Sequence, residues 1–185
     1  MTITVLDPVT ALVLIDLQKG IVGLPTAHPT AGIVERSAQL AKAFRARGLP
    51  VVLVNVAGVA PGRIDAPARM GALPPDWAEL VPELDQQASD HTVTKLQWGA
   101  FHGTSLDQYL RRRGVTEIVL AGVATSIGVE STARGAHEHG YHVALITDAM
   151  TDLDAQSHQH SIEKIFPRLG QLGTTEDVLA LLKSR

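Results

Sequence analysis

Short apolar runs alternate with helix-like segments along the whole of this 185-residue chain. In the clearest runs every position is apolar, which is typical of strands that helices cover on both faces of a sheet. Alternation of this kind favours parallel strands joined by right-handed crossovers. The sequence therefore predicts a doubly wound, Rossmann-like three-layer α/β/α sandwich with a mainly parallel six-stranded sheet. The expected strands lie at residues 11–15, 51–54, 91–94, 118–121, 143–146 and 170–172.

Amphipathic segments between the runs predict the helices. The first expected helix spans residues 30–47, with Ile33, Leu40 and Phe44 on one face and Gly48 at its end. Further helices are expected at residues 104–113, 126–139, 154–167 and 174–182. The segment from residue 57 to residue 84 is rich in proline and glycine and is too long for a plain connection, so it is a candidate lid or binding loop. No repeat or linker divides the chain, and one domain is expected over residues 1–185.

Composition excludes several classes of protein. A net charge of -3 and a sequence pI near 6.2 give no basic surface for nucleic acid. No apolar stretch approaches the roughly 20 residues that span a bilayer, and the N-terminus does not resemble a signal peptide. A cytoplasmic protein with a small-molecule partner is expected. The absence of cysteine excludes disulfides and thiolate metal sites.

Residues able to do chemistry follow three of the runs. Asp16 and Gln18 come after the first run, Lys95 follows residues 91–94, and a turn into a helix follows residue 121. Because the carboxyl ends of parallel strands meet at one edge of a sheet, we expect Asp16 and Lys95 to share a cleft with the backbone of that turn.

Each of these residues also has a simpler interpretation. Asp16 could merely cap the turn that follows its strand. Most lysines are solvated, but Lys95 stands directly after a strand and before Trp98 and Phe101. Trp98 is a candidate for the site, and for Phe101 a place in the core is the stronger expectation.

Four segments carry a resemblance to a known family. Residues 122–134, Gly-Val-Ala-Thr-Ser-Ile-Gly-Val-Glu-Ser-Thr-Ala-Arg, resemble the strand–turn–helix of the isochorismatase-like hydrolases. Residues 11–20 look like the first motif of that family, residues 94–101 like its lysine motif, and residues 140–149 like its next strand and Asp-Ala pair. The resemblance covers nearly the whole chain in order. It implies a hydrolase of isochorismatase-like fold that assembles as a homo-oligomer, a dimer or tetramer.

The resemblance also shows what this chain lacks. Most members of the superfamily are amidases with an Asp-Lys-Cys triad, and Asp16 and Lys95 match the acid and the lysine. Gly128 stands where the nucleophilic cysteine would be, and the hydroxyls of Ser126 and Ser131 are not at that position. A thioester mechanism is therefore not available to this chain.

Isochorismatases, which also carry glycine at this position, cleave a vinyl ether without a covalent intermediate. Likeness to them implies that Asp16 protonates the substrate, Lys95 holds a substrate carboxylate and Gln18 orients Asp16. Amides around Gly128 would hold a second oxygen, since a helix start offers free N–H groups. The alternative explanation for Gly128 is close packing of its helix against the sheet.

The remaining candidates for substrate binding are Trp98, Val123, Ala124, Thr125 and an arginine of the long loop. The arginine is Arg63 or Arg69, between which spacing does not decide. The resemblance also places a non-proline cis peptide between Val123 and Ala124.

Two departures leave the substrate open. Ala124 stands where isochorismatases have a tyrosine that binds substrate, so isochorismate itself is in doubt. Residues 55–57, Asn-Val-Ala, do not match the metal motif of nicotinamidases, and neither a metal nor another cofactor is expected. The alternative function is a catalytically silent member that binds a metabolite or serves as an assembly component.

Overall fold

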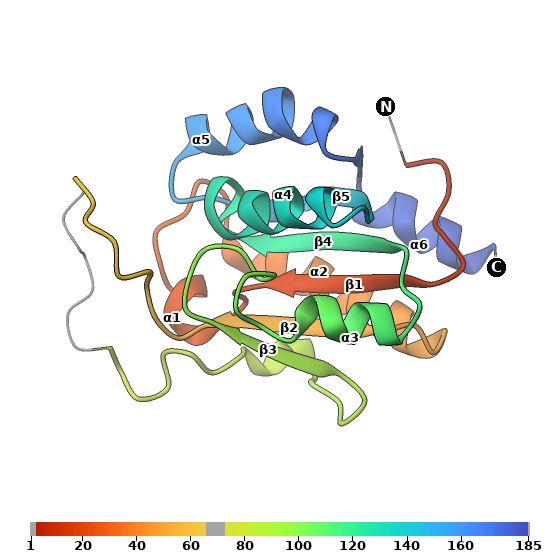
Figure 1. Cartoon of the computed structure of the whole chain (residues 1–185), viewed down its shortest axis with the longest axis horizontal. Helices are drawn as coiled ribbons and strands as arrows, with labels where there is room; N and C mark the ends of the chain where they lie inside the picture. The colour runs from red at the N-terminus through yellow and green to blue at the C-terminus, as the bar shows by residue number, and fades with distance from the viewer. Residues whose placement is uncertain (1–2, 66–72, 185) are drawn as a thin grey trace.

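The sheet is six-stranded and parallel throughout. The structure, a computed structural model, describes residues 3–65 and 73–184. Its strands are β1 (Thr10–Ile15), β2 (Val51–Val56), β3 (His91–Lys95), β4 (Glu117–Val123), β5 (His142–Thr151) and β6 (Gln171–Gly173). They lie in the order β3-β2-β1-β4-β5-β6. The predicted doubly wound α/β fold is confirmed (Figure 1).

The direction of winding reverses between β1 and β4. From β1 the chain adds β2 and β3 on one side, then returns to place β4 against the other side of β1, with Leu14 opposite Ala121. Figure 1 shows β1 and β4 side by side in the middle of the sheet. In open parallel sheets, ligands bind outside the carboxyl ends of the strands at this reversal. The residues that follow β1 and β4 are therefore placed where a site is expected.

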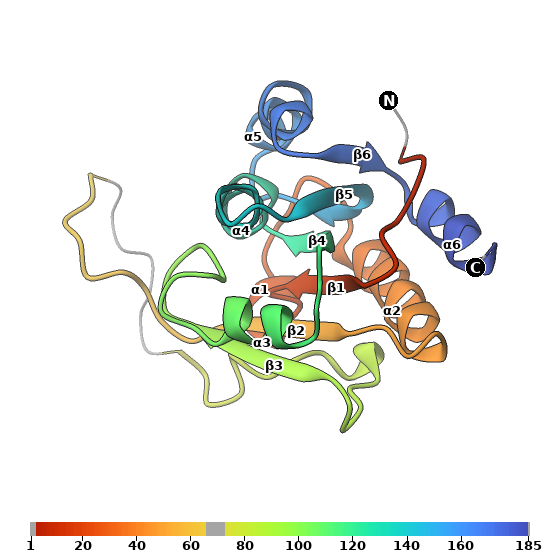
Figure 2. The same cartoon turned by 45° about the vertical axis from the view of Figure 1, so that its right-hand side comes forward.

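Helices cover both faces of the sheet. The helices are α1 (Lys19–Val22), α2 (Thr30–Ala46), α3 (Leu106–Arg112), α4 (Glu130–Glu138), α5 (Ala155–His160) and α6 (Thr175–Lys183). Figure 2 shows α2 and α6 on one side of the sheet and α3, α4 and α5 on the other. No helix in the described part of the chain has the length and apolarity needed to cross a bilayer.

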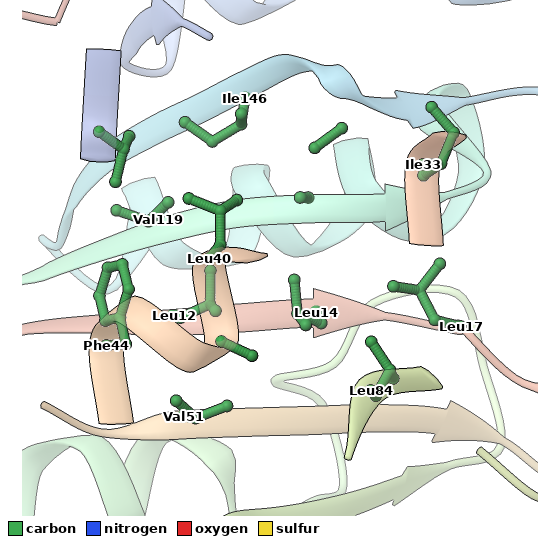
Figure 3. Packing of buried hydrophobic residues seen from close by; sticks show 14 of the residues in the cluster. Leu12, Leu14, Leu17, Ile33, Leu40, Phe44, Val51, Leu84, Val119 and Ile146 are labelled. Carbon is green, nitrogen blue, oxygen red and sulfur yellow. The ribbon is translucent and has the colours of Figure 1, made fainter. Parts of the chain in front are cut away.

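The sheet separates two apolar cores, and alternate residues of β1 point into one and then the other. Leu12 and Leu14 pack with α2 and α6, and Figure 3 shows Leu40 and Phe44 of α2 beside them. Val13 and Ile15 face the other way, toward α3 and α4. All positions of β1 are buried because both faces are covered, which explains why its sequence is a continuous apolar run.

The helix expected at 126–139 begins differently from the prediction. It opens as a π-helical turn over Thr125–Val129 and becomes α-helical only in α4. The helix expected at 154–167 is likewise divided into α5, a π-helical turn over Ser161–Ile165 and a 3-10 turn over Phe166–Arg168. A further 3-10 turn spans Pro82–Leu84. Such π-helical turns are frequent at functional sites, and the first of these opens the segment after β4.

Candidate active site

An ion pair lies beyond the carboxyl ends of the central strands. Asp16 directly follows β1, and Lys95, the last residue of β3, reaches across β2 to meet it. The Lys95 Nζ donates a hydrogen bond to Asp16 Oδ2 over 2.7 Å. The side chains are only 2% and 7% exposed for Lys95 and Asp16. The predicted meeting of a carboxyl and an ammonium group is confirmed.

Asp16 is poised between its two protonation states. Burial raises its pKa from 3.8 to about 6, although the neighbouring Lys95 charge and hydrogen bond act to lower it. Its Oδ2 atom is bonded to Lys95, while its Oδ1 atom is buried and has no hydrogen-bond partner among the residues that the structure describes. A proton on this carboxyl group would therefore be carried by Oδ1, the oxygen free to transfer it.

Lys95 keeps part of its donor capacity. Besides Asp16, its Nζ donates to the Gln97 carbonyl oxygen over 3.2 Å. An ammonium group has three N–H bonds. The third has no acceptor within the part of the chain that the structure describes.

A pocket of about 260 Å³ opens onto this pair. Asp16 and Lys95 are its charged residues, and Gln97 is its other polar side chain. Every other residue that lines it is apolar or glycine: Ile21, Leu24, Val56, Gly58, Val59, Trp77, Trp98, Val123, Ala124, Ile127, Gly128 and Leu153. The volume lies just below the range of about 300–1,000 Å³ that is usual for ligand pockets, so only a small molecule fits.

Gly128 brings the turn after β4 close to the ion pair. A Cβ at this position would lie 2.9 Å from Ile15 Cγ2 and 3.2 Å from Asp16 Oδ2. The first contact agrees with the packing explanation, since it is between the helix start and the sheet. The second places residue 128 directly beside the carboxylate, so the absence of a side chain there shapes the pocket as well. The predicted cis peptide between Val123 and Ala124 is present at this turn.

Comparison with known proteins identifies the family. The sequence model of the isochorismatase domain matches residues 10–177. The chain belongs to the isochorismatase family. It is 47% identical over 181 residues to the uncharacterized isochorismatase family protein YwoC of Bacillus subtilis, and the match covers 94% of each chain. It is 43% identical over 182 residues to the uncharacterized family protein YecD of Escherichia coli O157:H7, covering 94% of this chain and 96% of that one.

A solved structure agrees with this assignment. An isochorismatase family protein from Burkholderia thailandensis superposes with a TM-score of 0.94 at 46% sequence identity. The superposition covers 98% of this chain and 100% of that one. The fold and the family therefore rest on agreement over nearly the full length.

Gln18 has a different role in this isochorismatase-family pocket from the one expected. Its amide nitrogen donates to the carbonyl oxygens of Val56 (3.0 Å) and Trp77 (3.1 Å), and its amide oxygen accepts from the Val56 N–H (2.7 Å). These bonds use both amide hydrogens, so the expectation that Gln18 orients Asp16 is corrected. Gln18 is fully buried and joins the end of β2 to the wall that carries Trp77.

Thr125 and Arg63 lie outside the pocket. Thr125 is buried with its Oγ1 atom 2.8 Å from Nδ1 of His158, so its side chain turns away from the pair. Arg63 is exposed and does not line the pocket. The structure gives neither residue a contact that supports its expected role in substrate binding, and both roles stay predictions. The alternative arginine, Arg69, lies outside the described residues.

The aromatic residues of the lysine motif divide as expected. Trp98 lines the pocket while 63% of it is exposed, so it lies at the mouth. Phe101 packs against the core, and its ring centroid lies 5.1 Å from that of His139.

Most amides at the helix start are already bonded. The Ser126 N–H donates to Asp152 Oδ2 over 2.6 Å, and the N–H groups of Ile127 and Val129 donate to the Ala124 carbonyl oxygen. The prediction that amides around Gly128 hold a substrate oxygen is corrected for these three. Neither Ser126 nor Ser131 lines the pocket.

Sequence reasoning missed two residues that shape the site. Trp77 forms part of the wall, but its position in a long irregular segment gave no sign of this. Asp152 is almost fully buried and fixes the turn after β4 through Ser126. An acidic residue just beyond the Asp-Ala pair at the end of a strand could have suggested such a role for Asp152.

Proposed function

We propose that this protein is a hydrolase that acts on a small metabolite without a covalent enzyme intermediate, and that it cleaves a vinyl ether with Asp16 as general acid. The observation that carries the proposal is the buried Oδ1 of Asp16, which has no partner among the described residues, in a pocket whose described lining has no thiol or hydroxyl nucleophile. By resemblance, Gly128 occupies the position of the family's cysteine, and the full sequence contains no cysteine.

The chemistry begins with a proton transfer. Asp16 Oδ1 gives its proton to the terminal carbon of the C=C bond, whose electron pair forms the new C–H bond. The adjacent carbon becomes an oxocarbenium ion stabilised by the ether oxygen. Burial supports this role because it holds the Asp16 pKa near 6, so that the acid form is accessible near neutral pH.

Water completes the hydrolysis. It adds to the oxocarbenium carbon and loses a proton to the Asp16 carboxylate, which restores the acid. In the resulting hemiketal the hydroxyl loses its proton as the C–O bond to the leaving group breaks, and the leaving oxygen gains a proton, so that a keto acid and an alcohol are released. Lys95 would hold the carboxylate of that acid through its remaining N–H group.

Isotope labelling and the pH profile together test the mechanism. When purified protein hydrolyses a panel of small enol ethers in D₂O, we expect one solvent deuterium in the methyl group of the keto acid, measured by mass spectrometry. The kcat should fall on the alkaline side of the pH profile, where Asp16 loses its proton. Attack of water on the vinyl carbon also leaves the alcohol with its own oxygen, so transfer of ¹⁸O from H₂¹⁸O to the alcohol would contradict the mechanism.

Two variants distinguish the loss of the catalytic acid from general damage to the structure. Asp16→Asn should lose essentially all turnover. Asp85→Asn is a matched control, because Asp85 also has a positive φ (46°, against 53° for Asp16) but lies outside the pocket. It should keep wild-type kcat. An active Asp16→Asn enzyme, or turnover of amides by the wild type, would overturn the proposal.

A catalytically silent binding protein is the second candidate function. Ala124 in place of the family's tyrosine and the exposed position of Arg63 favour it, because both reduce the groups available to bind substrate. Ligand binding without turnover of any enol ether in the panel would support this candidate over the first.

A further inference from the structure

The charge of the pocket depends on one proton. With Asp16 ionised, the Asp16–Lys95 pair has no net charge. With Asp16 protonated, the pair carries a single positive charge on Lys95. The acid form that the proposed reaction needs is therefore also the form that favours a ligand with one negative charge.

We propose that the pocket selects a small monocarboxylate with an apolar body, and that Asp16 takes up a proton as the ligand's carboxylate reaches Lys95. This inference rests on the proposed function for the placement of the ligand against the ion pair. It goes further by stating the charge and shape of the ligand and the proton that accompanies binding.

Lys95 offers one place for a carboxylate. Two of its N–H groups are used by Asp16 Oδ2 and by the Gln97 carbonyl oxygen, which leaves one donor for a ligand. A charge-assisted hydrogen bond in so buried a setting is stronger than one between neutral groups.

The part of the pocket wall that the structure describes has no group that could pair with a second negative charge on the ligand. The elements around Asp16 present apolar side chains: Ile21 from α1, Val56 from β2, Trp77 from the long loop, Ile127 after β4 and Leu153 after β5. Asp152, which follows β5, directs its oxygens to the amides of Ser126, Leu153 and Asp154. A second ligand carboxylate would be buried without a partner, which is costly.

Proton uptake follows from the same geometry. A ligand carboxylate on Lys95 places a second negative charge beside the Asp16 carboxylate, and like charges in one site raise the pKa of one of them. Burial already raises the pKa of Asp16. Asp16 therefore takes the proton, and its Oδ1 is left ready to transfer it.

Calorimetry with simple probes tests the ligand class. At pH 5.5, benzoate, benzamide and terephthalate present one, no and two negative charges on similar apolar bodies. We expect benzoate to bind the wild type, and benzamide to bind about 10- to 100-fold more weakly because it lacks the charge. Terephthalate should bind more weakly than benzoate. Binding of benzamide or terephthalate as tight as that of benzoate, or no binding of benzoate, would overturn the inference.

Proton counting tests the coupling. Titrations of benzoate at one pH in two buffers of different ionisation enthalpy, such as PIPES and ACES, give the number of protons taken up. With an Asp16 pKa near 6, uptake should be about 0.9 proton at pH 7 and about a quarter of a proton at pH 5.5. Binding of benzoate without uptake at pH 7 would overturn the coupling.

Variants test whether Asp16 takes up the proton and whether Lys95 supplies the positive charge. In Asp16→Asn the pair no longer titrates, so benzoate should bind about tenfold tighter than to the wild type at pH 7, without proton uptake. Lys95→Met should abolish binding, whereas Lys42→Met, an exposed lysine on α2, should leave it unchanged. Tighter binding without uptake in Asp16→Asn supports the inference, and an unchanged proton uptake contradicts it.

The two proposals can fail separately. Proton-coupled benzoate binding with no turnover of any enol ether would contradict the proposed function and leave this inference standing. Turnover of enol ethers together with benzoate binding that takes up no proton would contradict this inference and leave the proposed function standing.

Discussion

A carboxyl group at the end of β1 has lost nearly all contact with water and has gained only one charged partner. Asp16 is held at a φ of 53°, a conformation that aspartate tolerates better than most residues with a Cβ. Its amide N–H donates to the Val54 carbonyl oxygen over 2.9 Å, which fixes the backbone at this point. Burial outweighs the attraction of Lys95 in setting its pKa. The position of this one residue accounts for the acid chemistry proposed here.

The raised pKa of Asp16 has a consequence for stability. Between its unfolded value of 3.8 and its folded value near 6, the folded protein binds more protons than the unfolded chain. The contribution of Asp16 to stability is therefore complete below pH 3.8 and is lost as the pH rises through 6. We expect the unfolding free energy of the wild type, relative to Asp16→Asn, to fall by about 2 kcal/mol between pH 4 and pH 7. Urea unfolding of both proteins at each pH measures this, and a difference that rises with pH would contradict it.

Gly128 should not tolerate a side chain. In Gly128→Ala the new methyl group would press on Ile15 Cγ2 and Asp16 Oδ2, neither of which is the end of a flexible chain. We expect kcat/KM for an enol ether to fall by about 10- to 100-fold, since a displaced acid loses its alignment.

Gly32→Ala is the matched control for this change. At Gly32 in α2 the nearest atom to a new Cβ is Arg36 Nη1, at 3.1 Å, which can move aside. That variant should keep its activity and gain about 0.5–1 kcal/mol in helix stability. Equal activity of the two variants would show that residue 128 does not shape the site.

At the scale of elements, the junction of β1 and α1 organises the pocket. The segment just before Pro82 returns to this junction: Val81 N–H donates to Leu17 O, and Lys19 N–H to Glu79 O. Gln18 adds side-chain bonds from the same junction to Val56 and Trp77. The wall that contains Trp77 is thus attached to the segment directly after β1, where Asp16 lies.

Removal of the Gln18 amide should loosen that wall. Gln18→Ala would leave the N–H and carbonyl groups of Val56 without their Gln18 partner, and the Trp77 carbonyl oxygen would keep only the bond from the Gly20 N–H. We expect a loss of about 1–3 kcal/mol in unfolding free energy. Benzoate affinity should fall as well, because Trp77 then has one hydrogen bond fewer to the junction. Gln39→Ala, an exposed glutamine on α2, should stay within about 0.5 kcal/mol of the wild type. An unchanged Gln18→Ala protein would contradict this account of the junction.

At the scale of the whole molecule, the strand order explains why the site lies where it does. The reversal between β1 and β4 leaves no crossover helix above their carboxyl ends, so the residues that follow both strands border an open space. Asp16 directly follows one of these strands, and Gly128 lies in the turn that follows the other. Lys95 completes the site from β3, which is two strands away from β1.

The assembly state stays a prediction at this scale. The family resemblance implies a homo-oligomer, a dimer or tetramer. Light scattering coupled to size-exclusion chromatography should give a mass two or four times the 19.7 kDa of one chain. A single species at the mass of the chain across the concentration range would contradict it.

The sequence by itself determined the strands, the places of the longer helices and the two charged residues of the site, but not α1 or the π-helical and 3-10 turns. Continuous apolar runs mark strands buried on both faces, and the polar residues directly after them can only lie at the edge where such strands end. Each of these inferences depends on neighbours along the chain, which is why Asp16, Lys95 and the turn through Gly128 could be predicted together.

Only the tertiary structure decided how the remaining side chains are used. The amide of Gln18 could reach Asp16 or the backbone of Val56, and the choice depends on where the long loop returns. Thr125 turns to His158 and Ser126 to Asp152 because segments after β5, distant in sequence, pack beside them. Hydrogen bonds and burial between distant segments depend on packing in three dimensions, and so does the balance of burial and charge that sets the pKa of Asp16.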